Sequence, residues 1–182
     1  MWGIIYLIRH TRLKIKEGIC YGSTDIDLAD SFLEEAELIR EKFKDIPIGR
    51  VYCSPLNRCK KLAECFKRRI IFDNRLIEMD FGDWEGVSWN EVFQEEEGKR
   101  WFANYIDEKC PNGESYRDLH KRVELFLKEI PLDAKATLII THSGVIRAFL
   151  SVLNITTPEE SFSIEISYGQ IIKIKDGDYK LL

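Results

Sequence analysis

The sequence predicts an α/β protein: a three-layer α/β/α sandwich with a mostly parallel central sheet and an antiparallel edge. Short apolar, β-branched runs alternate along the chain with longer segments whose apolar residues recur at helical spacing. Near the C-terminus the pattern becomes strand-like on both sides of Asp176-Gly177, a pair typical of a hairpin turn. With 182 residues and 45% hydrophobic composition, the chain suits a single domain over residues 1–182.

Four apolar runs account for the parallel part of the predicted sheet. These strands are expected near residues 2–8, 51–53, 70–72 and 137–140. The intervening segments predict helices near residues 31–44, 57–69, 88–106, 115–129 and 145–153. In the first helix the apolar face is formed by Phe32, Ala36, Ile39 and Phe43. The helix after Ser115 has the capping residues expected of a helix start.

The C-terminal segment is predicted to supply the antiparallel edge. Phe162, Ile164 and Ile166 alternate with other residues, and so do Ile172 and Ile174. Because alternation with a period of two is typical of half-buried strands, both stretches are predicted to be extended. An antiparallel pair at the end of a parallel sheet is common in mixed sheets.

The first predicted strand ends in a cluster of reactive side chains, Arg9, His10 and Thr11. Like-charge repulsion from the arginine disfavours the protonated imidazole, so His10 is expected to be neutral and nucleophilic near neutral pH. The same arginine is suited to hold an anion against that nucleophile. On this segment alone, a histidine that serves only as a turn residue is the more common case.

A second histidine follows the predicted strand at 137–140. His142 precedes Ser143 and Gly144, which open a predicted helix whose unpaired N–H groups and dipole favour an anion. If the two strands are parallel neighbours, their carboxyl ends meet at one edge of the sheet, where open α/β sheets bind ligands. His10 and His142 are therefore expected to face each other across one pocket.

Two further segments carry charged residues that fit the same edge. Arg58 follows Ser54-Pro55 in the first turn of a predicted helix, where a cation opposes the helix dipole. Such local conflict often marks a functional residue, although a surface arginine is the alternative. Glu78 lies in a carboxylate-rich, glycine-containing loop over residues 75–86, which offers a general acid or is simply solvated.

Together these segments resemble the histidine phosphatase superfamily, also called phosphoglycerate mutase-like, over nearly the whole chain and in the correct order. The family pattern is Arg-His-Gly, Ser-Pro followed by an arginine, a glutamate before Gly-x-x-Glu-Gly, and a late His-x-Gly. The matching residues are Arg9-His10, Ser54-Pro55 with Arg58, Glu78 with Gly82 and Glu85-Gly86, and His142-Ser143-Gly144. Thr11 departs from the family glycine. With residues 18–22 and 25–28, this departure looks most like the α-ribazole phosphatase branch.

The resemblance implies a phosphomonoesterase that uses no metal and no cofactor. His10 would form a phosphohistidine, and Glu78 would act as general acid and then general base. Arg9, Arg58 and His142 would bind the phosphate and stabilise the transition state. Substrate contacts would come from Thr11, Tyr21, Gly22, Ser143 and Gly144. The branch implies α-ribazole 5′-phosphate as substrate, in the assembly of the nucleotide loop of cobalamin.

Other functions stay open on the sequence: a phosphoglycerate mutase-type phosphotransferase, a broad-specificity phosphatase and a non-catalytic phosphate-binding module. The chain is short for such a mutase and has no obvious extra basic segment to retain a bisphosphate intermediate. Metal-assisted hydrolysis is disfavoured, since the chain has only three histidines, no pair of them spaced i, i+4 and no Cys-x-x-Cys. His120, the third histidine, is predicted to be a surface or satisfied side chain.

Net charge and cysteine content restrict the classes of binding partner and the cellular location that the sequence predicts. A formal net charge of −4 does not indicate binding to nucleic acid or to an anionic membrane. The resemblance implies a small-molecule phosphomonoester as the partner. No apolar run is long enough to span a bilayer, and no secretory signal is evident. Five cysteines without metal-like spacing favour reduced thiols and a cytoplasmic location. The sequence does not indicate an oligomeric state.

Aromatic residues are dense between residues 84 and 110. They are Trp84, Trp89, Phe93, Trp101, Phe102 and Tyr105. Packing of an amphipathic helix is the simpler explanation. The alternative is a lid over the phosphate pocket, in which an aromatic ring stacks on a flat ring of the substrate.

Overall fold

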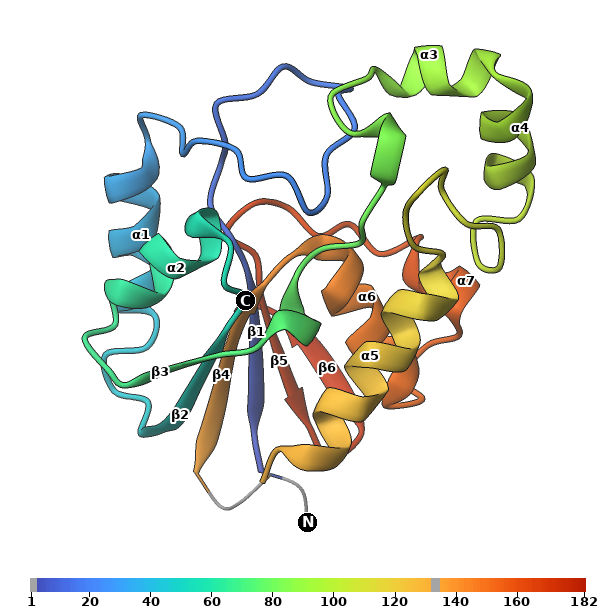
Figure 1. Cartoon of the computed structure of the whole chain (residues 1–182). Coiled ribbons are helices and arrows are strands. Elements are labelled where there is room, and N and C mark those ends of the chain that lie inside the picture. The colour runs from blue at the N-terminus through green and yellow to red at the C-terminus, as the bar shows by residue number, and fades with distance from the viewer. Residues whose placement is uncertain (1–2, 132–134) are drawn as a thin grey trace.

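The computed structural model describes residues 3–131 and 135–182, which form one six-stranded sheet between two layers of helices (Figure 1). The strand order is β3-β2-β4-β1-β5-β6. Strands β3, β2, β4 and β1 are parallel, whereas β5 and β6 are antiparallel to their neighbours. The strands are β1 (Ile5–Arg9), β2 (Ile48–Cys53), β3 (Ile70–Phe72), β4 (Ala136–Thr141), β5 (Ile171–Lys175) and β6 (Asp178–Leu181). The predicted α/β class with an antiparallel edge is confirmed.

Helices cover both faces of the sheet, which explains why its central strands read as continuous apolar runs. Every residue of β4 is buried. One face carries α1 (Phe32–Glu41) and α2 (Asn57–Glu64), and the other carries α5 (Tyr116–Glu129) and α6 (Ser143–Val152) (Figure 1). The shorter helices are α3 (Trp89–Gln94), α4 (Glu96–Ala103), α7 (Pro158–Ser161) and two 3₁₀ turns, η1 (Asn74–Leu76) and η2 (Gly82–Trp84).

The sheet register brings the two predicted histidine segments together. In the parallel pair of β1 and β4, Arg9 lies opposite Thr141, so His10 and His142 are the next residues at the same edge. On the other side of β4, β2 ends at Cys53 and is followed by Ser54, whose backbone N–H donates to the carbonyl of Ile140. The expectation that these strand ends share one edge is confirmed.

The single helix predicted over residues 88–106 is wrong, because two short helices occupy this stretch. The Ser88 hydroxyl caps α3 by accepting from the Glu91 N–H, and the Glu91 carboxylate accepts from the Ser88 N–H. The backbone becomes extended at Glu95, where α3 ends and α4 begins. A Cβ on Gly98 would lie 1.8 Å from the carbonyl oxygen of Val92, so the close packing of α4 on α3 requires glycine there.

The strand predicted over residues 162–166 is also wrong. The alternation there reflects side chains of an irregular segment, in which the Phe162 ring packs on Tyr105 and Tyr116 while Ile166 is buried. The terminal hairpin is instead β5–β6. Asp176 and Gly177 form its turn with φ values of 54° and 83°, as a two-residue hairpin turn requires.

Other predicted boundaries differ by a few residues. The helix predicted over 57–69 ends at Glu64, and Lys67 beyond it has a φ of 50°. Strand β1 begins at Ile5, while Trp2 of the predicted strand lies outside the described residues. Ser115 caps α5 together with Asp118, as predicted.

Candidate functional site

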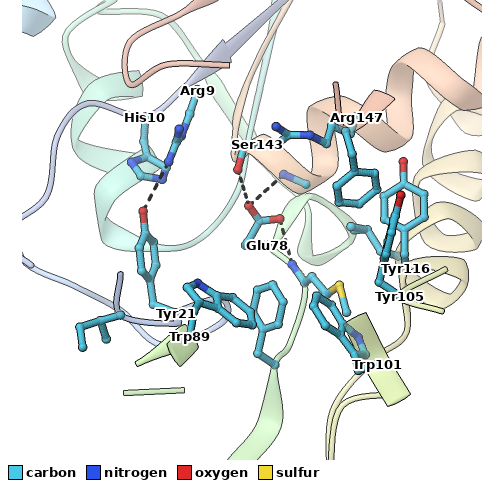
Figure 2. A pocket seen from close by; sticks show the side chains of 16 residues that line it. Arg9, His10, Tyr21, Glu78, Trp89, Trp101, Tyr105, Tyr116, Ser143 and Arg147 are labelled. Carbon is cyan, nitrogen blue, oxygen red and sulfur yellow. Dashed lines mark hydrogen bonds between the residues drawn. The ribbon is translucent and has the colours of Figure 1, made fainter. Parts of the chain in front are cut away.

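A cavity of about 210 Å³ lies at the carboxyl edge of the sheet (Figure 2). Its polar side is lined by six of the predicted site residues: Arg9, His10, Tyr21, Glu78, Ser143 and Gly144. The opposite wall is aromatic and includes Phe81, Trp89, Trp101, Tyr105, Tyr116 and Phe162. The cavity therefore joins a charged centre to an apolar compartment that a bound organic group could fill.

His10 is buried and held in one orientation. Its Nδ1 lies 2.8 Å from the carbonyl oxygen of Thr11. Because a carbonyl only accepts, Nδ1 carries the proton and the Nε2 lone pair is free. Burial, together with the charges of Arg58 and Arg9, holds the pKa of His10 well below its usual range. The imidazole is therefore neutral near neutral pH, as predicted for a nucleophile.

His142 lies beside His10, with ring centroids 5.2 Å apart. Arg58 donates from Nε to Nδ1 of His142 over 3.3 Å, so the proton of this imidazole is on Nε2, which lies 2.9 Å from the Ser54 hydroxyl. Burial and the charge of Arg58 hold the pKa of His142 well below its usual range. His142 is therefore a neutral N–H donor.

Arg58 is completely buried and does not line the cavity. Besides His142, it binds the loop after β1: Nη1 donates to the Thr24 carbonyl over 2.7 Å and Nη2 donates to the Gly22 carbonyl. A carboxylate oxygen of Asp25 lies 3.8 Å from Nη1. Arg58 thus connects His142 to this loop, and its cation is held next to the two histidines.

Arg9 is held by two tyrosines and a carbonyl. Its guanidinium carbon lies 4.0 Å from the ring centre of Tyr168, and Nη1 donates to the Ile166 carbonyl over 2.6 Å. The Tyr21 hydroxyl is 3.5 Å from Nη2 and 2.7 Å from the Tyr168 hydroxyl. Tyr168 is not predicted as a site residue from the sequence, because it lies in an irregular loop that is distant from Arg9 along the chain.

Glu78 lies at the N-terminus of α6. One carboxylate oxygen accepts from the Gly144 N–H over 3.0 Å and is 3.4 Å from the Ser143 hydroxyl, while the other accepts from the Met79 N–H (Figure 2). A Cβ on Gly144 would lie 2.4 Å from this carboxylate, so glycine permits the approach. Arg122, which sequence reasoning missed, donates to the Glu78 carbonyl and holds the loop.

Three motif residues have positions that suit support rather than contact with the cavity. Thr11 is fully buried, and its carbonyl orients His10. A Cβ on Gly22 would lie 1.8 Å from the carbonyl oxygen of Met79, so two loops touch at this glycine. Glu85 accepts from the backbone N–H groups of Ser23 and Thr24 over 2.8 and 2.7 Å, which fixes the loop that Arg58 binds.

The remaining histidine and the cysteines offer no second catalytic centre among the described residues. Within residues 3–131 and 135–182, no group of three or more His, Cys, Asp or Glu side chains is arranged to hold a metal ion. His120 is partly buried and lies 6.4 Å from the Tyr116 ring, away from the cavity lining. All five cysteines are unpaired. No described helix is both long and apolar enough to cross a membrane.

The fold and the paired histidines define a class of enzyme. Residues 5–181 match the histidine phosphatase superfamily (branch 1). The chain belongs to this superfamily, which confirms the resemblance noted in the motifs and identifies it as an enzyme of the phosphatase class. The match runs through almost the whole chain.

The chain is similar to particular members of that superfamily. It is 26% identical over 190 residues to an adenosylcobalamin/alpha-ribazole phosphatase of Salmonella typhimurium, covering 95% of this chain and 91% of that one. It is 27% identical over 158 residues to phosphoserine phosphatase 1 of Hydrogenobacter thermophilus, covering 82% and 75%. The crystal structure of the alpha-ribazole phosphatase from Shigella flexneri has the same fold, with a TM-score of 0.87 and 24% identity over 98% of this chain and 94% of that one.

Proposed function

We propose that the protein is a metal-independent phosphomonoesterase that works through a phosphohistidine intermediate. One observation carries this proposal: His10 is neutral, presents a free Nε2, and lines a cavity together with Arg9 and Glu78. A neutral imidazole held in one tautomer is ready to attack phosphorus without first losing a proton. The mutase and the non-catalytic module remain the alternatives that experiment must exclude.

The first step transfers the phosphoryl group to His10. Nε2 forms a bond to phosphorus as the ester P–O bond breaks, and protonated Glu78 gives its proton to the departing oxygen. Glu78 is suited to this role because its carboxyl group lines the cavity with His10 while three donors fix its position. In the second step the Glu78 carboxylate takes a proton from water, whose oxygen attacks phosphorus, breaks the P–N bond and releases phosphate.

Charge on the transferred group is stabilised from several sides. Arg9 supplies donors that line the cavity, and His142 would supply its Nε2–H on releasing the Ser54 hydroxyl. The Ser143 hydroxyl and the Gly144 N–H, which are hydrogen-bonded to Glu78, stand at the N-terminus of α6. Arg58 contributes its charge and, through the hydrogen bond to Nδ1, fixes the tautomer of His142, whose Nε2–H points at the Ser54 hydroxyl 2.9 Å away. Thr11, Tyr21 and Gly22 support these groups through the contacts described above.

α-Ribazole 5′-phosphate is the proposed natural substrate, which implies a role in assembling the nucleotide loop of cobalamin. Two findings support it: the similarity to phosphatases named for this ester, and the aromatic wall beside the charged centre, which suits a flat ring. Residues 84–110 would act as a lid over that ring. The unpaired cysteines support the proposed cytoplasmic location.

The proposal is tested by phosphate release from α-ribazole 5′-phosphate, sugar phosphates, nucleotides and phosphoglycerates in excess chelator, with His10→Ala as the blank. Release that persists in chelator and disappears in the blank is expected. A clear preference in kcat/KM for α-ribazole 5′-phosphate would support the natural substrate, whereas slow, even release would leave a broad-specificity phosphatase.

Two other outcomes would contradict the proposal. Isomerisation of phosphoglycerate without net release of phosphate would identify a mutase. A protein that takes no phosphoryl label from any phosphomonoester, and releases no phosphate, would be a binding module. Trapping of acid-labile label on the wild-type protein but not on His10→Ala would separate the enzyme from the module.

A further inference from the structure

A second cation lines the cavity beyond Glu78, and the phosphoryl-transfer mechanism does not use it. Arg147 lies four residues after Ser143 in α6, so the two side chains project from the same side of the helix. Figure 2 shows Ser143 and Glu78 between His10 on one side and Arg147 on the other. Arg147 therefore faces the part of the cavity where the alcohol of the ester would lie.

The guanidinium of Arg147 is only partly compensated. Nη2 donates to the Ile164 carbonyl over 3.1 Å, and the guanidinium carbon lies 5.4 Å from the ring centre of Phe162. Nε is buried and donates no hydrogen bond to any residue in the ranges 3–131 and 135–182. Burial lowers the pKa of Arg147, which reflects the cost of keeping the charge there.

The donors that Arg147 does not use add to that cost, because a desolvated charge with unused donors is unfavourable. Arg58 is also buried but is compensated by two carbonyls and the Nδ1 of His142. Arg147 has one carbonyl, so an oxygen acceptor delivered by a ligand would complete its hydrogen bonding.

We propose that Arg147 is a specificity-determining residue that binds an oxygen acceptor on the leaving alcohol while the phosphate lies against His10. The acceptor is a carboxylate or a sugar hydroxyl, because a guanidinium carries donors only. This inference rests on the proposed phosphomonoesterase activity. The aromatic rings around Arg147 exclude water and strengthen such a bond, whereas an alcohol without an acceptor leaves the guanidinium unpaired.

The test compares Arg147→Met with the wild type on matched esters. Phosphoserine and phosphoethanolamine differ only by a carboxylate, and ribose 5-phosphate supplies hydroxyls that phenyl phosphate lacks. Removal of a hydrogen bond to a charged donor is expected to lower kcat/KM about 10- to 100-fold for the esters that carry the acceptor. Phosphoethanolamine and phenyl phosphate should change less than about threefold.

The two sources of the acceptor are distinguished by which ester responds. Loss on phosphoserine alone identifies a carboxylate, and loss on ribose 5-phosphate identifies a hydroxyl. An equal loss on all four esters would overturn the inference, because Arg147 would then act on the phosphate or on Glu78. No loss on either acceptor-bearing ester would also overturn it.

Binding to the His10→Ala protein separates this inference from the proposed chemistry. Calorimetry is expected to show tighter binding of phosphoserine than of phosphoethanolamine, or of ribose 5-phosphate than of phenyl phosphate. In the His10→Ala protein, the further substitution Arg147→Met should abolish the difference in affinity within each pair of esters. Arg147→Lys in the same protein should retain part of that difference. Equal affinities within both pairs would overturn the inference even if the enzyme hydrolyses every ester.

A matched surface variant controls for the loss of a positive charge. Arg117 is exposed and pairs with Asp107 away from the cavity lining. Arg117→Met should change neither kcat/KM nor affinity for any of the four esters. A thermal midpoint for Arg147→Met close to that of the wild type would show that the cavity is still folded.

Discussion

At the scale of single residues, Glu78 determines whether the proposed reaction depends on the leaving group. Glu78→Gln keeps the shape of the side chain and removes the proton that the departing oxygen needs. We expect kcat for alkyl phosphates to fall by about 10²- to 10⁴-fold, the usual contribution of general acid catalysis. With p-nitrophenyl phosphate, whose leaving group needs no proton, the loss in the first step should be much smaller.

The control for this experiment is Asp83→Asn, which changes an exposed carboxylate of the same loop that accepts from Asn112. It should leave both esters unaffected. A loss by Glu78→Gln that is equal for both esters in single-turnover measurements of the first step would mean that Glu78 supports the site without donating a proton.

Gly144 is the second residue whose effect follows directly from geometry. An alanine there would place its Cβ 2.4 Å from a Glu78 carboxylate oxygen, so the carboxyl group must move. Gly144→Ala is therefore expected to reduce kcat with the same dependence on the leaving group as Glu78→Gln. Ser143→Ala, which removes only a contact of 3.4 Å, should have a smaller effect. A leaving-group dependence unlike that of Glu78→Gln would contradict this account.

The residues proposed to carry the chemistry could be singled out from sequence because each stands beside a local signal. Arg9 and His10 end an apolar run, and His142 precedes a helix start. Arg147 lies in the same motif segment as His142 but has no such local signal. Tyr168 could not be found, because its contact with Arg9 depends on how a loop folds back over β1.

At the scale of elements, α3 and α4 each contribute one tryptophan to the aromatic wall of the cavity. Trp89 and Trp101 stack with ring centroids 5.7 Å apart and both line it. If a flat ring of the substrate packs there, Trp89→Ala should lower kcat/KM for aromatic phosphomonoesters by up to about tenfold, the equivalent of one aromatic contact. Aliphatic esters should be hydrolysed almost as before.

Phe93 in α3 provides the matched control, since it is 51% exposed and does not line the cavity. Phe93→Ala should leave the ratio of aromatic to aliphatic turnover unchanged. If Trp89→Ala also leaves that ratio unchanged, the aromatic residues of 84–110 serve packing alone, and the lid proposal is wrong.

The elements were predictable where one periodicity ran over a long stretch. The buried run of β4 and the capped start of α5 are examples, because local pattern and tertiary environment agree there. The division of 88–106 into α3 and α4 depends on Gly98 packing against the carbonyl of Val92, a contact that periodicity does not report. The alternation of 162–166 resembles that of a strand because Phe162 packs on Tyr105 and Tyr116 and Ile166 is buried, although the backbone between them is irregular.

At the scale of the whole molecule, the buried neutral histidines link stability to pH. His10 and His142 both have pKa values held well below the usual range by burial, so each takes up a proton on unfolding when the pH lies below about 6.5. The stability of the fold with both histidines neutral is fully present above the unfolded pKa of about 6.5. It is lost as pH falls from about 6.5 toward the folded pKa, by about 1.4 kcal/mol per pH unit for each histidine.

Urea denaturation at pH 7.5, 6.0 and 5.0 measures this dependence. We expect His142→Gln to unfold with a shallower pH dependence than the wild type, because one of the two protonation steps is removed. The comparison uses the slope of the unfolding free energy rather than its absolute value, so a general loss of stability in the variant does not affect it. Parallel slopes for both proteins would show that His142 is not held neutral.

His10 and His142 lie at the ends of paired parallel strands, and this position bears on the exchange of helical segments between related proteins. The separation of their rings is set by the hydrogen-bonded ladder of β1 and β4, and the side chains that would recognise the alcohol come mainly from other segments. Grafting α3 and α4 from a relative with different specificity should thus change the preference for the apolar part of the substrate, and it should leave the proposed phosphoryl-transfer centre and Arg147 in place. In this architecture, the residues proposed for phosphoryl transfer and most of those in the aromatic wall lie on different segments of the chain.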